Sequence, residues 1–167
     1  MLALKITDLK AFTNSLFIGD TFDRFWLTEA SITTSSIFSI DGKLQEDFFD
    51  SDELSLLRQN HRTYALWKEI KPFCHSIVRS RHTPLHFKIV LQLSHNQIPS
   101  VLSSTQMDVI PETVKGLYLN LQYRNHELLC TTGTALSTFI PGKELDHLWD
   151  SMIENFFTQH NISFEKL

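Results

Sequence analysis

The stretch of the chain with the most enzyme-like composition runs from Cys130 to Thr134 and reads Cys-Thr-Thr-Gly-Thr. Hydroxyl groups and exposed amides around a glycine can hold a phosphate or a carboxylate, so Thr131, Thr132 and Gly133 are candidate anion-binding residues. Cys130 would act as a nucleophile only if a nearby cation or base lowered the pKa of its thiol. No Gly-x-x-x-x-Gly-Lys-Ser/Thr motif occurs, and Thr131 stands where an aspartic protease needs an aspartate. The structural alternative is a bulged strand rich in threonine.

A local concentration of positive charge is the second candidate, and it consists of Arg79, Arg81, His82, His86 and Lys88. Such a cluster could dock an anion, an acidic protein partner or a nucleic-acid backbone. In the structural alternative, Arg79 and Arg81 belong to the solvated end of a helix, where they meet the negative end of its dipole.

Metal-ligand spacings are the third kind of signal. Cys74 and His75 precede His82 and His86, but the four lack the compact spacing of a zinc site, and no His-Glu-x-x-His motif occurs. The acidic run over residues 46–53 lacks the glycine and the final glutamate of an EF-hand loop. We expect no metal and no cofactor.

Length and composition set the class of protein. The 167 residues suit one domain, and 42% hydrophobic residues are enough to bury a core. A net charge of −4 argues against a general nucleic-acid-coating role, although a local basic patch stays open. Cys74 and Cys130 are the only cysteines, and we find neither a signal peptide nor a long apolar run, so we expect reduced, buried thiols. These features predict a cytoplasmic protein without a membrane segment.

A predicted hairpin over residues 116–139 organises the elements that would position these candidates. Apolar residues alternate with polar ones from Leu117 to Tyr123, the period of a strand with one buried face. Asn125 can take a positive φ in the turn that follows, and Gly133 would mark a bulge in the returning strand. A helix at about 143–160 with a broad apolar stripe comes next. The sequence therefore predicts an α+β fold, a mostly antiparallel sheet with packed helices.

Further elements are predicted upstream of the hairpin. Trp26, Ala30 and Ile32 would share one face of a long strand, and Asp41-Gly42 would form a hairpin turn. Pro72 favours the first turn of its helix, because an interior proline costs about 3 kcal/mol. The predicted elements are a strand at 2–6, a helix capped by Thr7 or Asp8 over 9–17, strands at 22–34 and 37–40, a helix with a capping box at 51–59, a strand at 64–67, a helix starting near 68–71 and a strand at 85–93.

An internal repeat is a further hypothesis. An offset of 67 − 6 = 61 pairs Ile6 with Trp67, and the same offset pairs Phe12 with Phe73. The halves would be 1–60 and 61–140, each with a strand, a helix, a strand and a hairpin, followed by the helix at 143–160. This plan resembles that of DNA sliding clamps in fold alone. The alternative is a chance match between two amphipathic helices.

Three segments, Leu4–Thr34, Thr83–Leu93 and Leu129–Phe139, resemble an uncharacterised family of small proteins from anaerobic Firmicutes. The resemblance covers nearly the whole chain and implies no activity. The residues favour a non-enzymatic cytoplasmic protein that binds a protein partner or associates with itself. The alternative is an enzyme acting on a phosphorylated or other anionic small molecule. A deep pocket joining residues 130–134 to a histidine and an arginine would favour the enzyme, and a shallow charged or apolar surface would favour the binding protein.

Replacing Arg79 and Arg81 together with alanine separates the two interpretations of the basic cluster. If the arginines only cover a helix end, each change should alter the free energy of unfolding by less than about 1 kcal/mol and leave binding intact. We expect this result in urea unfolding and in salt-dependent capture of anionic probes. Loss of capture in a variant with unchanged stability would instead make the arginines a binding site.

Overall fold

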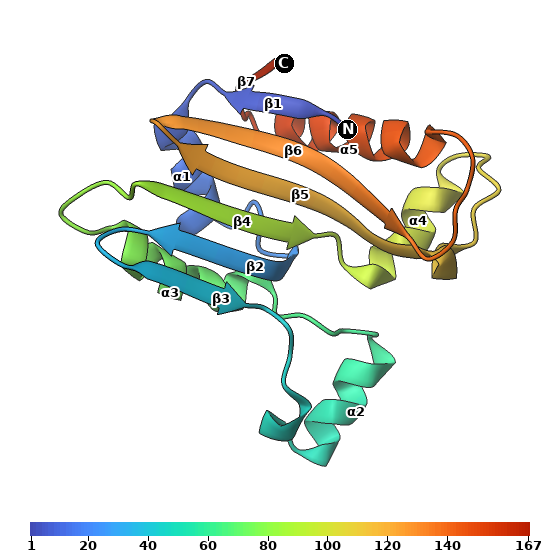
Figure 1. Cartoon of the computed structure of the whole chain (residues 1–167). Helices are drawn as coiled ribbons and strands as arrows, with labels where there is room; N and C mark the ends of the chain where they lie inside the picture. The colour runs from blue at the N-terminus through green and yellow to red at the C-terminus, as the bar shows by residue number, and fades with distance from the viewer.

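A computed structural model describes all residues 1–167 and shows a seven-stranded sheet in which every pair of neighbouring strands is antiparallel. The strand order is β3-β2-β4-β5-β6-β1-β7. In Figure 1, α1, α3, α4 and α5 lie behind this sheet, whereas α2 stands away from it. The predicted α+β class is confirmed.

The elements are β1 (Ala3–Ile6), α1 (Leu9–Phe17), β2 (Trp26–Thr33), β3 (Ile37–Asp41), α2 (Ser51–Gln59), α3 (Trp67–Val78), β4 (His86–Gln92), α4 (Ile98–Ser103), β5 (Val114–Arg124), β6 (Glu127–Leu136), α5 (Glu144–Gln159) and β7 (Phe164–Lys166), with short 3-10 helices at Glu46–Phe48, His95–Gln97 and Pro111–Thr113.

The hydrophobic core fills the space between the sheet and the helices. Along β4, Phe87, Ile89 and Leu91 are buried on the helix side, whereas Lys88 on the opposite side is exposed. Antiparallel sheets commonly bury one face and leave the other in water, and this alternation matches that arrangement. We call the face that these helices leave uncovered the outer face; toward the end of β4, Val90 and Gln92 are buried on it.

The β5–β6 hairpin forms where the sequence predicts it. Arg124 pairs with Glu127 across a two-residue turn, and Asn125 and His126 have φ values of 53° and 61°, as a type I′ turn requires. The bulge expected at Gly133 is wrong, because that residue pairs with Tyr118 in regular register. The register shift of this hairpin lies in β5 instead, between Val114 and Gly116.

The second strand differs from its prediction in where it begins and in which of its residues face the core. Strand β2 begins at Trp26 rather than at residue 22, because residues 21–24 form a turn. A bulge between Leu27 and Glu29 inserts one extra residue opposite β4, so Leu27 and Ala30 both enter the core. Trp26 pairs with Gln92 and lies on the outer face. The prediction that Trp26 shares a face with Ala30 is therefore wrong.

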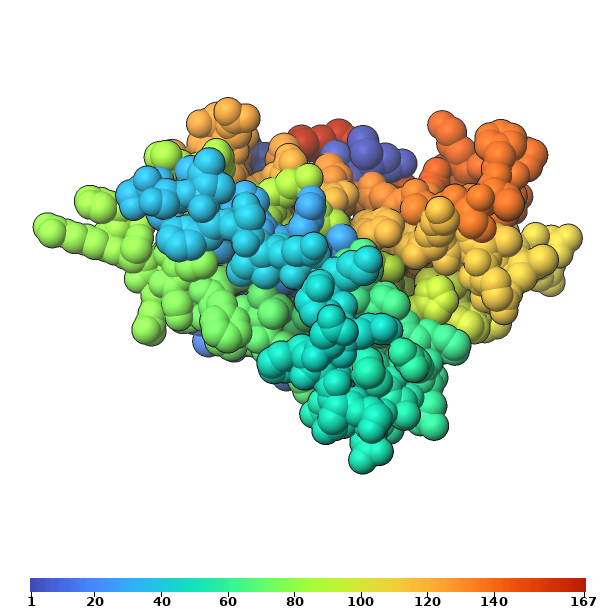
Figure 2. Space-filling view, turned by 60° about the horizontal axis from the view of Figure 1, so that its bottom comes forward, coloured from blue at the N-terminus to red at the C-terminus, as the bar shows by residue number.

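The predicted hairpin turn at Asp41-Gly42 is also wrong. Gly42 continues past the end of β3 and donates its backbone N–H to the carbonyl of Thr28, beside the bulge. The chain returns to the same place at Ala65, whose N–H donates to the carbonyl of Gly42. Residues 43–64, called the arm here, therefore leave and rejoin the sheet at one point. The arm includes α2 with its predicted capping box, and Figure 2 shows it in teal, projecting from the sheet.

Helix α3 starts earlier than predicted. It begins at Trp67, so Pro72 lies inside it, and no strand runs over 64–67. The Glu69 carboxylate accepts the N–H of Leu66 and fixes this start, while Pro72 is exposed and its lost hydrogen bond faces water. The Trp67 indole donates to the Leu16 carbonyl at 2.8 Å and joins α3 to α1.

The internal repeat with halves 1–60 and 61–140 stays a prediction.

The arm depends on close backbone contact at Gly42. A Cβ atom at this position would lie 1.8 Å from the Leu27 carbonyl oxygen, a distance that no side-chain rearrangement relieves. We expect Gly42→Ala to lower the free energy of unfolding by about 2–4 kcal/mol in urea titrations. Gly133→Ala is the matched control, because its new Cβ would lie 3.8 Å from the nearest side chain, and it should change stability by less than about 1 kcal/mol. Equal effects of the two substitutions would contradict this account.

Candidate functional site

The structure does not gather the predicted basic cluster into one site. Arg79 lies at the end of α3, and Arg81 and His82 follow it in an exposed loop. His86 and Lys88 lie on the outer face of β4, where Lys88 forms an ion pair with Glu29 at 3.3 Å. Among the four principal clefts, only one is lined by a member of the cluster, Lys88.

The threonine-rich candidates also point in different directions. Thr132 is buried on the helix side, where its hydroxyl donates to Asp150 and accepts the N–H of Leu2. Thr131 and Gly133 lie on the opposite side of β6, on a regularly paired stretch of strand. None of the four principal clefts is lined by a residue of 130–134. In this structure Thr132 therefore ties β6 to α5.

Both cysteines are free and buried in the core. Burial raises the pKa of the Cys74 thiol to about 12 and raises the pKa of the Cys130 thiol strongly as well. A thiolate is the nucleophilic form of cysteine, so neither residue has the environment of a nucleophile.

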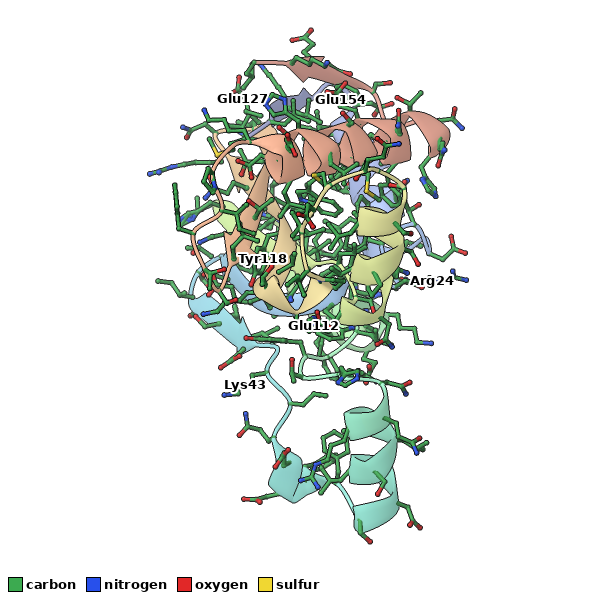
Figure 3. All side chains as sticks on the ribbon, turned by 90° about the vertical axis from the view of Figure 1, so that its right-hand side faces the viewer. Arg24, Lys43, Glu112, Tyr118, Glu127 and Glu154 are labelled. Carbon is green, nitrogen blue, oxygen red and sulfur yellow. The ribbon has the colours of Figure 1, made fainter.

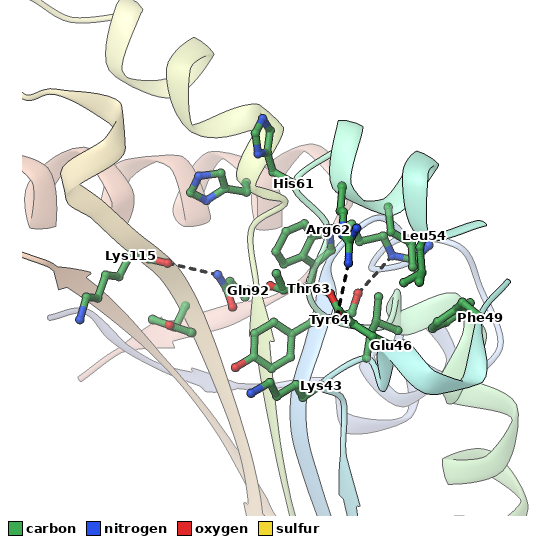
Figure 4. Close-up of a pocket in the computed structure, with 16 residues that line it drawn as sticks. Lys43, Glu46, Phe49, Leu54, His61, Arg62, Thr63, Tyr64, Gln92 and Lys115 are labelled. Atoms are coloured by element: carbon green, nitrogen blue, oxygen red, sulfur yellow. Dashed lines mark hydrogen bonds and ion pairs between the residues drawn. The ribbon is translucent and has the colours of Figure 1, made fainter. Parts of the chain in front are cut away.

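The largest cleft lies between the arm and the outer face of the sheet, in a region where the sequence showed no candidate (Figure 4). Its volume is about 940 Å³, within the range of small-molecule and side-chain sites. Helix α2 of the arm has no buried side chain. Its half-buried apolar residues Leu54 and Leu57 line the cleft. The arm therefore forms one wall and the sheet forms the other.

Positive charge dominates this cleft. Four cationic side chains line it, against the single carboxylate of Glu46. Arg58 pairs with Glu46 at 3.6 Å, and Arg62 pairs with Glu69 outside the cleft. The other two cations make no ion pair within the chain, and they come from segments far apart in sequence. They are Lys43 at the base of the arm, labelled in Figure 3, and Lys115 on β5.

The sheet side of the cleft carries aromatic rings and a buried amide. Trp26 and Tyr64 lie with their ring centroids 6.4 Å apart, and the ring of Tyr118 occupies the space beside Gly116, where a Cβ would lie 2.6 Å from it. Desolvation by burial raises the pKa of Tyr118, so its phenol stays protonated and can donate a hydrogen bond. Gln92 is 4% exposed and holds two long hydrogen bonds of 3.4 Å, to Thr28 and to the Lys115 carbonyl.

A model of a family of unknown function, DUF5721, matches residues 15–165. The chain belongs to this family. Comparison with characterised proteins and with solved structures gives no match. The matched range includes every residue that lines the large cleft of this DUF5721 protein.

Two general features complete the description of this DUF5721 chain. No three of its histidine, cysteine, aspartate and glutamate side chains are grouped so that they could hold a metal ion. Its helices are also too short or too polar to cross a membrane.

Sequence reasoning missed the cleft because its parts are scattered along the chain. Lys43 and Lys115 are separated by 115 − 43 = 72 residues and line the same cleft only because of the strand order β2-β4-β5. Neither lies in a cluster of like charge, so no local composition signal marks them. The only sequence signal for the arm is the capping box of α2. This box predicts a helix but not the position of that helix relative to the sheet.

Thiol labelling tests the assignment of both cysteines to the core. With their pKa raised by burial, Cys74 and Cys130 should react with a thiol reagent at pH 8 at least about a hundredfold more slowly in the folded protein than in urea. Mass spectrometry of each labelled peptide measures the two rates. Rapid modification of Cys130 in the folded protein would contradict the assignment and revive the nucleophile hypothesis.

Proposed function

We propose that this DUF5721 protein is a non-enzymatic binding protein whose large cleft holds an anionic group of its partner. The observation that carries the proposal is the excess of cations in the lining of an aromatic cleft, two of which, Lys43 and Lys115, make no ion pair. Their charge attracts a carboxylate or a phosphate, and the surrounding rings lower the local dielectric constant and strengthen the attraction.

The neighbouring polar groups suit the same ligand. Arg62 donates to the Tyr64 carbonyl through Nε, and this bond orients its guanidinium beside the cleft. The protonated phenol of Tyr118 adds a neutral hydrogen-bond donor. A bound anion would therefore meet several donors that the fold already holds in place, which lowers the cost of ordering them.

Binding explains the cleft better than catalysis does. His61 and His95, whose ring centroids are 6.3 Å apart, are the groups in the cleft best suited to acid–base chemistry. Neither ring is hydrogen-bonded to a group that would orient it and select its tautomer, unlike the rings of His126 and His160. The alternative, an enzyme acting on an anionic small molecule, would use these two histidines rather than Cys130.

The setting of the protein belongs to the same proposal. Two free, buried thiols suit a reducing compartment, so we place its function in the cytoplasm. We also infer that the family occurs in anaerobic Firmicutes. Self-association through the outer face is the other form that partner binding could take, and the exposed Ile37 on the edge strand β3 would favour it.

Charge removal in the cleft tests the proposal. Citrate and pyrophosphate are suitable probes, since one presents carboxylates and the other phosphates. We expect Lys43→Ala combined with Lys115→Ala to weaken binding of at least one probe by about tenfold or more, measured by calorimetry at low salt, because two unpaired charges of the cleft lining are lost.

The matched control is Lys10→Ala combined with Lys68→Ala, which removes two exposed lysines from α1 and α3 and causes the same change in net charge. This control should bind the probes as the unmodified protein does. Equal weakening in both double variants would mean that only net charge matters. No binding to the unmodified protein at low salt would reject the anion site.

A further inference from the structure

The large cleft is the middle part of a longer groove. A second cleft, of about 640 Å³, lies over β2 and β3 and shares Tyr64 with the large one. A third, of about 370 Å³, lies beside α4 and shares His61 and His95 with it. Figure 4 shows His61 and Tyr64 at opposite ends of the large cleft, so the two smaller clefts adjoin it from opposite ends, and we treat the three together as one groove.

The charge along this groove changes sign twice. Its middle carries the unpaired cations Lys43 and Lys115. Over β2 and β3 the groove is lined by Glu29 and Asp41, and only Lys88 opposes these two carboxylates. At the other end Glu112 is the sole charged residue apart from histidine, and it makes no ion pair. The order along the groove is therefore acidic, basic, acidic.

This order distinguishes between possible polymeric ligands. A nucleic-acid strand carries negative charge at every nucleotide, so it would bring phosphates against the carboxylates at both ends of the groove. A polypeptide can carry a negative residue in its centre and positive residues on either side. Its backbone amides can also pair with polar groups of the lining, such as the phenol of Tyr118.

We propose that the groove binds an extended polypeptide segment of a partner protein, with acidic residues at its centre and a basic residue toward each end. This inference rests on the proposed anion site and names its ligand class. The central acidic residues face Lys43 and Lys115, and a basic residue at one end faces Glu112. The length of the groove, rather than a single deep pocket, gives the protein its selectivity.

Selection from a random peptide library displayed on phage tests the inference. The unmodified protein should enrich peptides with central aspartate or glutamate and flanking lysine or arginine. The variant Lys43→Ala with Lys115→Ala should lose this enrichment, and the control Lys10→Ala with Lys68→Ala should keep it. Glu112→Gln should keep the central acidic preference but lose the preference for a basic residue at one end.

The best selected peptide is then synthesised with a fluorescent label and compared with a labelled oligothymidylate. We expect the peptide to bind at least about tenfold more tightly, with an affinity that falls as salt rises. Tighter binding of the oligothymidylate would overturn the inference in favour of a nucleic acid. No enrichment, or the same peptides from the unmodified protein and the cleft variant, would overturn it too. If citrate or pyrophosphate still binds in that case, the anion site stands and only its peptide ligand is rejected.

Discussion

The backbone contact between Gly42 and the bulge of β2 is the constraint on which the candidate site depends. At the bulge, β2 stops pairing with β3. The Thr28 carbonyl of β2 accepts the N–H of Gly42 at 2.9 Å, and the Leu27 N–H of β2 donates to the carbonyl of Ala65 at 2.8 Å. The bulge also changes the phase of β2, so that Leu27 enters the core while Trp26 turns to the outer face. One irregularity thus anchors the arm and supplies the aromatic floor beneath it. A side chain at residue 42 would break both arrangements.

Packing on one side only explains why the rest of the sheet is available for binding. Polar contacts hold the helices on the inner face: the Trp149 indole of α5 donates to the carbonyl of Tyr118, and threonines of β6 bond to Asp146 and Asp150 of α5. The Trp67 indole of α3 donates to the carbonyl of Leu16 and so joins α3 to α1. These polar contacts fix the helices in register on the sheet, because a buried donor or acceptor left without a partner is costly. No helix covers the outer face in Figure 1, and Lys43 and Lys115 in the lining of the large cleft make no ion pair.

The arm has a different energetic character from the sheet. Helix α2 buries no side chain, so its stability comes from its capping box and from the two chain segments that anchor it at the bulge. Segments with few buried contacts open at lower free energy than the core. A cleft with one firm wall and one weakly packed wall can adjust to ligands of different width, which suits a partner-binding groove more than a site that must hold reacting atoms within a fraction of an ångström.

Local sequence determined the elements whose signals lie within one turn or one hairpin. Asp8 and the Asp50–Glu53 box begin α1 and α2, and Asn125 supports the turn of β5–β6, because capping and positive φ depend on neighbouring residues only. The tertiary structure alone decided the bulge at Leu27, the start of α3 and the presence of Lys43 and Lys115 in the lining of one cleft. Each of these depends on which strands pair and in which register, and pairing is set by the burial of the whole core rather than by any short stretch of the chain.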